Sequence, residues 1–206
     1  MLLRALLWSP SHTPLAFKPR TQSDLRRRCP RAQMENLSPV VVEEPRMVAV
    51  NQPNAFRLSG HAWEEICRHA EAAFPEECCG VVLSDGVFDQ VRPLNNIQNQ
   101  LHALDPETYP RTAAIAYAMD PHELDRVISE AEARGLRLTA FYHSHPEHEA
   151  YFSEEDKAFA SPFGEPNFPG AAQIVVSVYS RAVKRLAAFG WSDEKQDFVE
   201  IPLERT

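Results

Sequence analysis

Two histidines separated by a single residue follow an apolar run in the second half of this chain. Residues 136–142 read LRLTAFY, and residues 143–146 read HSHP. The apolar, β-branched and aromatic residues of this run, placed after Gly135, predict a buried strand. Because side chains alternate across a strand, His143 and His145 project from the same face and can both reach one metal ion. The fold is therefore expected to place a metal site at the end of a buried strand.

A carboxylate follows at a distance that suits such a site. Asp156 lies eleven residues after His145, in the segment SEED, which predicts a helix that begins with Ser153 as its N-cap. Two histidines and one carboxylate give zinc three protein ligands and leave a fourth position for water, as in catalytic zinc sites. Bound zinc lowers the pKa of water to about 7 and polarises carbonyl groups. The alternative is that this segment forms only a capping box and that the histidine pair is incidental.

An acidic residue at the start of a second buried strand is the next candidate. Residues 60–74 have apolar side chains at helical spacing and end before Pro75, and residues 78–83 form an apolar run that predicts a central strand. Glu77 stands at the entrance of this strand. Burying an unpaired charge is costly. Glu77 is therefore either a functional carboxylate or a solvated turn residue.

The three segments PEECCG, HSHP and SEED together resemble the JAMM (MPN+) metalloprotease family. Carried over position by position, the resemblance implies that His143, His145 and Asp156 bind zinc. It also implies that Glu77 is the general acid/base and that Ser153 supports the tetrahedral oxyanion.

The resemblance covers about residues 56 to 203 and implies an α/β fold in which a mixed sheet is wrapped by helices. The short prokaryotic members of this family act on ubiquitin-like sulfur-carrier proteins and cut the amide bond beyond the carrier's C-terminal Gly-Gly. The short connections between the catalytic segments leave no room for the insertions with which eukaryotic relatives grip a second ubiquitin. The expected partner is therefore a Gly-Gly-ended ubiquitin-like or sulfur-carrier protein.

Two other functions stay open at this point. One is a zinc peptidase or amidase that acts on small peptides or amino-acid conjugates. The other is an MPN scaffold without catalytic activity, although the complete set of Glu, His, His, Ser and Asp argues against it.

The remaining patterns predict scaffold. A helix is expected over residues 121–134, and strands over 171–180, 181–191 and 197–203. The proline-rich loop at residues 161–170 is expected to line the cleft. His148 is interpreted as a solvated loop residue.

The four cysteines form no CxxC pair and no secreted disulfide framework. Cys78 and Cys79 are expected to point to opposite faces of their strand as small buried residues. Cys79 as a thiol nucleophile beside His143 is the weaker alternative, since zinc makes better use of the same histidine. Reduced thiols indicate a cytoplasmic location.

The first 50 residues differ in charge from the rest of the chain. Residues 1–33 carry a net charge of +6 within a total of −8, so residues 34–206 carry −14. We interpret residues 1–50 as a disordered basic extension, which an early start codon could explain because Met34 and Met47 both precede the domain expected over residues 51–206. The acidic body argues against nucleic acid as a partner. The initial apolar segment LLRALLW is too short to span a bilayer, so no membrane association is expected.

Overall fold

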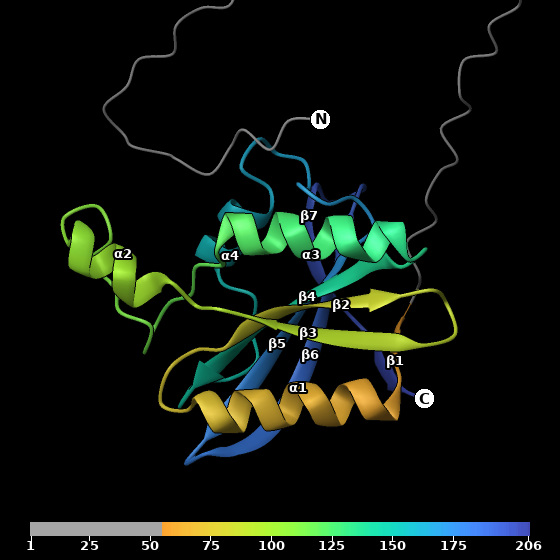
Figure 1. Ribbon diagram of the computed structural model, residues 1–206, viewed down its shortest axis with the longest axis horizontal. Coiled ribbons are helices and arrows are strands. Elements are labelled where there is room, and N and C mark those ends of the chain that lie inside the picture. Colours follow the sequence, from red (N-terminus) through yellow and green to blue (C-terminus); the bar gives the residue numbers. More distant parts are fainter. Residues whose placement is uncertain (1–54) are drawn as a thin grey trace, which may run out of the picture. The chain divides into compact units, whose positions relative to one another are not determined.

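The computed structural model describes residues 55–206, which form a twisted mixed sheet with helices on both faces (Figure 1). The basic extension expected over residues 1–50 lies outside the described residues and stays a prediction.

Six strands form the main sheet in the spatial order β3-β2-β4-β5-β6-β7. They are β2 (Cys79–Ser84), β3 (Asp89–Leu94), β4 (Arg137–Pro146), β5 (Ala172–Tyr179), β6 (Ala182–Ser192) and β7 (Asp197–Ile201). The pair β4–β5 is parallel and the other pairs are antiparallel. A separate parallel pair joins β1 (Phe56–Leu58) to β8 (Leu203–Arg205). The mixed α/β sheet predicted from the sequence is confirmed.

Four helices accompany the sheet in residues 55–206: α1 (Gly60–Ala73), α2 (Gln98–Leu104), α3 (Pro121–Ala133) and α4 (Glu154–Ala160). Helix α3 begins where the sequence predicts, because the Asp120 side chain accepts hydrogen bonds from the N–H groups of His122 and Glu123. It ends just before Gly135, whose φ of 74° is a conformation that glycine adopts without a steric penalty.

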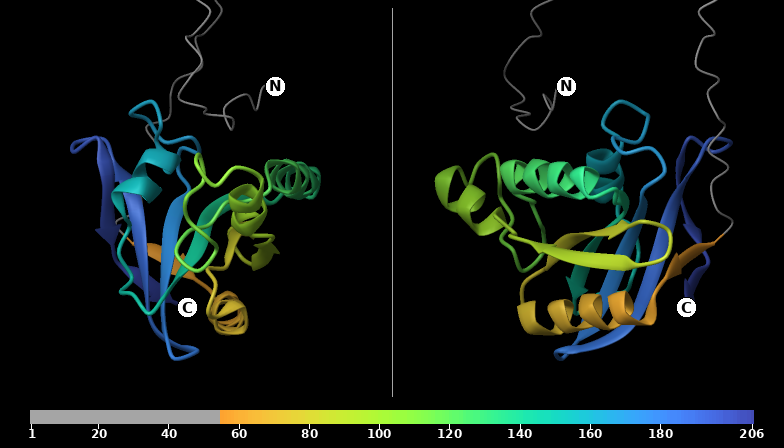
Figure 2. Two further views of the ribbon diagram at one scale, coloured as in Figure 1. Left: turned by 90° about the vertical axis from the view of Figure 1, so that its left-hand side faces the viewer. Right: turned by 45° about the vertical axis from the view of Figure 1, so that its right-hand side comes forward.

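The helices cover different parts of the sheet. Figure 2 shows α1 and α3 on opposite sides of the β2–β3 end, with α4 beside the β5–β6 strands. Cys78 packs into the core under α1, and Cys79 packs into the core under α3. The prediction that these two thiols point to opposite faces is thus confirmed. Both are free and buried, as is expected of small apolar residues.

Some elements differ from the sequence predictions. The last strand, expected over residues 197–203, is interrupted at Pro202, which cannot donate a backbone hydrogen bond. Residues 203–205 pair instead with β1. Strand β3 was not predicted, because Pro93 hides its pattern; β3 is an edge strand, where a proline is tolerated.

None of the helices within residues 55–206 has the length and apolar character needed to cross a bilayer.

Candidate metal centre

Strand β4 carries both predicted histidines on one face. Alternation along the strand directs His143 and His145 to the side on which Asp156 of α4 lies, and both imidazoles are buried. β4 is flanked by β2 and β5, with Cys79 opposite His143 on one side and Val175 on the other. Backbone pairing on both edges therefore holds the histidines in place.

The loop after β4 returns the chain to the site. The Glu147 N–H donates to the Val178 carbonyl at 2.7 Å, and the Ser177 hydroxyl donates to the His148 carbonyl at 2.7 Å. The Glu149 carbonyl lies 3.0 Å from His145 Nδ1. This contact favours the tautomer that carries its proton on Nδ1 and leaves the Nε2 lone pair free to bind a metal.

Helix α4 begins with the capping box expected from the sequence. Asp156 N–H donates to Ser153 Oγ at 3.1 Å, and Ser153 N–H donates to Asp156 Oδ2 at 2.9 Å. The Ser153 hydroxyl also lies 2.6 Å from the same carboxylate oxygen. The capping box and the ligand position are thus compatible, because the cap orients the Asp156 carboxylate toward the histidines.

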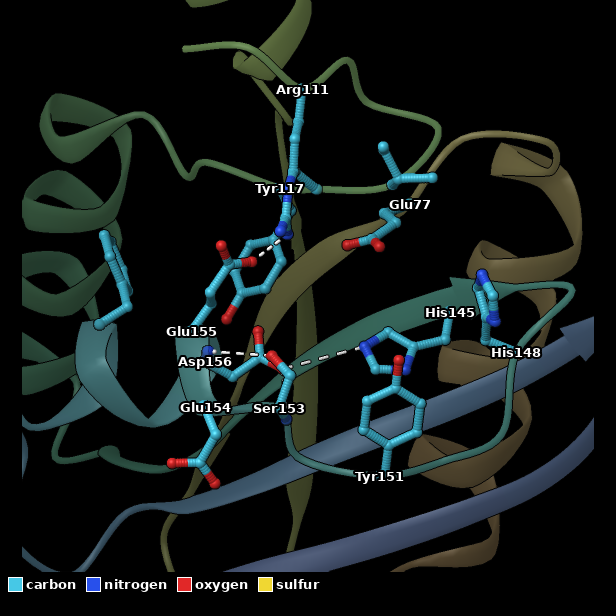
Figure 3. Close-up of a pocket in the computed structure, with 13 residues that line it drawn as sticks. Glu77, Arg111, Tyr117, His145, His148, Tyr151, Ser153, Glu154, Glu155 and Asp156 are labelled. Atoms are coloured by element: carbon cyan, nitrogen blue, oxygen red, sulfur yellow. Dashed lines mark hydrogen bonds and ion pairs between the residues drawn. The ribbon is translucent and has the colours of Figure 1, made fainter. Parts of the chain in front are cut away.

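The predicted ligand atoms converge. His143 Nε2 lies 3.1 Å from His145 Nε2 and 3.6 Å from Asp156 Oδ2, and His145 Nε2 lies 3.9 Å from that oxygen. In a tetrahedral zinc site with ligand bonds near 2.0–2.1 Å, ligand atoms are about 3.3 Å apart. The three residues therefore fit one small metal ion. Figure 3 shows two of them, His145 and Asp156, at the edge of the cleft.

The ionisation of these groups also suits a metal. Burial, and then the proximity of His143, lower the pKa of His145 to about 4. Burial raises the pKa of Asp156, but its pairing with His143 and its hydrogen bonds from Ser153 outweigh this effect and lower the pKa to about 2. A neutral imidazole and an ionised carboxylate are the forms that bind metals.

Glu77 lies at the side of the metal centre, just before β2, and is only 8% exposed. Burial, and then the charge of Asp156, raise the pKa of Glu77 to about 8, against the opposing effect of Arg111. Its N–H donates to the Ala113 carbonyl at 2.7 Å, and its carbonyl accepts from Asn96 Nδ2 at 2.9 Å. The backbone N–H and carbonyl of Glu77 are thus both hydrogen-bonded. Because the residue is also buried, the alternative interpretation as a solvated turn residue is wrong.

A direct link joins the strand of the histidines to the segment of Glu77. The Cys78 N–H donates to Ser144 Oγ at 2.8 Å, and the Ser144 N–H donates to the Cys78 carbonyl at 3.0 Å. Ser144 stands between the two histidines, and Cys78 follows Glu77. This contact therefore helps to set the distance between the candidate metal ligands and the carboxylate of Glu77.

A cleft of about 680 Å³ opens over the site. Glu77, His145, Ser153 and Asp156 contribute to its walls, and it is completed by Arg111, Ile115, Ala116, Tyr117, His148, Tyr151, Glu154, Glu155 and Phe159. The proline-rich loop at residues 161–170 does not contribute, so the prediction that it lines the cleft is wrong; Phe168 of that loop packs on Phe141 instead. His148 is exposed at the cleft, in agreement with its interpretation as a solvated residue.

Several residues near the site have no recognisable signal in the sequence. Tyr117 stacks on His143 at 4.4 Å between ring centroids, and Tyr151 meets His145 edge to face at 4.9 Å. Arg111 pairs with Glu155. The segment that holds Arg111 and Tyr117 has no helical or strand periodicity, and tertiary hydrogen bonds and stacking place it at the site.

The Cys79 thiol is an unsuitable nucleophile. It is fully buried and donates to the Leu94 carbonyl at 3.7 Å, and burial raises its pKa. A thiol that stays protonated and lacks access to substrate does not support covalent catalysis.

Comparison with known proteins gives consistent matches. Residues 60–189 match the family model described as prokaryotic homologs of the JAB domain. A curated protein named desampylase, from Haloferax volcanii, is 26% identical over 151 residues, which cover 71% of this chain and 95% of the relative.

Two solved structures are similar to this chain, and the first of them supports the fold. The solution structure of a protein from Desulfitobacterium hafniense is 23% identical, with a TM-score of 0.55 over 73% of this chain and 92% of that one. The crystal structure of a JAB1/MPN domain protein from Archaeoglobus fulgidus is 17% identical, with a TM-score of 0.41 over 72% of this chain and 99% of that one.

Proposed function

This chain belongs to the family of prokaryotic homologs of the JAB domain, and we propose that it is a zinc-dependent isopeptidase that hydrolyses the amide bond after the C-terminal Gly-Gly of a ubiquitin-like or sulfur-carrier protein. The observation that carries the proposal is the convergence of two buried imidazoles and an ionised carboxylate beside a buried glutamate, in an open cleft.

His143, His145 and Asp156 would hold the zinc ion. The donor set of two nitrogens and one oxygen leaves a position free for water or substrate, which distinguishes catalytic from structural zinc sites. When bound, zinc supplies a Lewis acid and lowers the pKa of a water molecule toward neutrality.

Glu77 is the proposed general acid/base. A carboxylate whose pKa is raised to about 8 takes up a proton from the attacking water near neutral pH and returns it to the leaving amine. Because both polar groups of its backbone are hydrogen-bonded, the backbone of Glu77 is fixed beside the ligand set.

Ser153 is the proposed donor to the oxyanion. Its hydroxyl hydrogen points at Asp156 Oδ2, and rotation about the Cβ–Oγ bond would redirect it to the carbonyl oxygen of the substrate. The Ser153 N–H still holds the same carboxylate oxygen at 2.9 Å, so this rotation leaves Asp156 in place.

The substrate is proposed from two sources. The name of the Haloferax relative indicates removal of a ubiquitin-like modifier by that protein. The cleft over the ligand set has a volume of about 680 Å³, which leaves room for the thin, extended tail of such a modifier. Hydrolysis of small peptides is the alternative substrate class. A cytoplasmic location, inferred from cysteine usage, stays a prediction.

The test combines metal content with cleavage. Wild-type protein is expected to hold about one zinc ion per chain and to cleave a fusion at the Gly-Gly of a ubiquitin-like protein. Glu77→Gln should keep zinc and lose cleavage, whereas Asp156→Ala should lose both. Glu76→Gln, which removes a neighbouring exposed carboxylate, is the matched control and should stay active. Cleavage of dipeptides without cleavage of the fusion would favour the alternative substrate class, and a metal-free, inactive wild type would favour the non-catalytic scaffold.

A further inference from the structure

The cleft has more acidic than basic side chains, and the proposed mechanism assigns no role to its arginine, Arg111. Its walls contain four carboxylates, those of Glu77, Glu154, Glu155 and Asp156. Among the cleft-lining residues of the described chain, Arg111 is the only lysine or arginine. An anionic group of a substrate can therefore find a fixed positive side chain at one place in this cleft.

Arg111 stands beside the proposed proton donor. Its positive charge lowers the pKa of Glu77 against the effect of burial, so the guanidinium is close enough to act on that carboxylate. Figure 3 shows the guanidinium between the Glu155 and Glu77 side chains. Because Glu77 protonates the leaving amine, Arg111 lies on the amine side of the scissile bond.

The Arg111 guanidinium has N–H groups that are available to a ligand. Arg111 pairs with Glu155 through one terminal nitrogen, and no other side-chain partner of the guanidinium is found within residues 55–206. A guanidinium carries five N–H donors and binds carboxylates through two parallel hydrogen bonds. The backbone of Arg111 is anchored, since its carbonyl accepts from Nε2 of the buried Gln98 at 2.8 Å.

The chemistry of the leaving group then limits the substrate. In a single amino acid, the carboxylate carbon is two bonds from the amine nitrogen. A leaving amine beside Glu77 therefore brings its own carboxylate near Arg111. A lysine side chain joined through its Nζ has no carboxylate at that distance, and a longer peptide has a neutral amide there. Without the guanidinium, the exposed carboxylates of Glu154 and Glu155 would repel a carboxylate that enters this part of the cleft.

We propose that Arg111 binds the free α-carboxylate of one amino acid on the amine side of the scissile bond, so that this protein releases a single C-terminal amino acid from its carrier. This inference rests on the proposed function and names the leaving group. Arg111 is then the residue that determines specificity for that group.

Matched substrates test the inference. A Gly-Gly-ended ubiquitin-like protein is extended by one alanine, made either as the free acid or as the carboxamide, and a third form carries an Nα-acetyl-lysine amide linked through Nζ. Zinc-loaded wild type should cleave the acid with a kcat/KM about 10- to 100-fold above that of the carboxamide, mainly through KM, as expected for a bidentate charged hydrogen bond. Arg111→Gln should bring the ratio close to one, and Arg111→Lys should keep part of it.

The ratio of kcat/KM for the acid to that for the carboxamide separates carboxylate recognition by Arg111 from its other effects. Any change in the ionisation of Glu77 affects both substrates equally and cancels in the ratio. Arg126→Gln, which removes an exposed positive charge on α3 away from the cleft, is the control and should leave the ratio unchanged.

The outcomes distinguish this inference from the proposed function. Equal cleavage of all three forms by the wild type would overturn the role of Arg111 while leaving the isopeptidase activity intact. Preference for the lysine-linked form would also overturn it. Cleavage of none of the three by zinc-loaded protein would refute the proposed function itself.

Discussion

Asn96 provides the sharpest test of how Glu77, the proposed general acid/base, is held in place. Its Nδ2 donates to the carbonyls of Glu77 at 2.9 Å and Ala116 at 3.2 Å. Its Oδ1 accepts from the N–H groups of Gln98 and Ala118, both at 3.0 Å. One half-buried side chain thus ties the segment of Glu77 to the residues on both sides of Tyr117.

The magnitude follows from these four hydrogen bonds. At about 0.5–1.5 kcal/mol each, reduced because water can reach a half-buried site, their loss in Asn96→Ala should lower the free energy of unfolding by about 2–4 kcal/mol. A shift of about 1 Å in Glu77 should lower kcat by about 100-fold. Zinc content should stay near that of the wild type, because β4 and α4 carry the ligands.

Urea unfolding, kcat and elemental analysis measure these three quantities. Asn95→Ala is the matched control, since the Asn95 side chain makes no hydrogen bond within residues 55–206. Its backbone N–H, which donates to the Glu123 carboxylate at 2.9 Å, is kept in the variant. Asn96→Asp keeps the two accepted hydrogen bonds and replaces the two donors with an acceptor, so it should lower kcat at least as much as Asn96→Ala. An Asn96→Ala protein with an unchanged kcat would refute the idea that this side chain positions Glu77.

Three further results are expected. Arg111→Gln removes a positive charge that lowers the pKa of Glu77, so the acidic limb of the pH profile of kcat/KM, measured on the carboxamide substrate, should move to higher pH. An unmoved limb would contradict this. Because the pKa of His145 is lowered to about 4, this imidazole stays neutral above that value, and zinc release followed by a chelating dye should begin only as the pH falls below about 5; release near pH 6.5 would contradict it. Ser144→Ala leaves the buried Cys78 N–H without its acceptor and should lower the free energy of unfolding by about 1–3 kcal/mol in urea, whereas a change below 0.5 kcal/mol would show that water replaces the hydroxyl.

The ligand set could be proposed from the sequence because its spacing is local. His143 and His145 share a strand face by alternation, and Asp156 is placed by a capping box that involves only neighbouring residues. Helices α1 and α3 could likewise be predicted from the spacing of their apolar residues and from their N-caps, and the end of α3 from Gly135.

The position of Glu77 could not be derived in the same way. Its place beside the ligands depends on the pairing of β2 with β4 and on the contact of Cys78 with Ser144, residues that are 66 positions apart. Sequence resemblance suggested the role, but burial and the charge of Asp156 are what raise its pKa.

The sequence by itself determined the elements and the chemical types of the metal ligands, because periodicity, capping and ligand spacing act over a few residues. Only the tertiary structure decided which loop forms the cleft wall and that Arg111, Tyr117 and Asn96 meet the site. These side chains lie in segments without periodicity, and their positions result from hydrogen bonds and stacking between distant parts of the chain. The contacts of a single side chain with a distant segment depend on the packing of the whole domain, which no local pattern encodes.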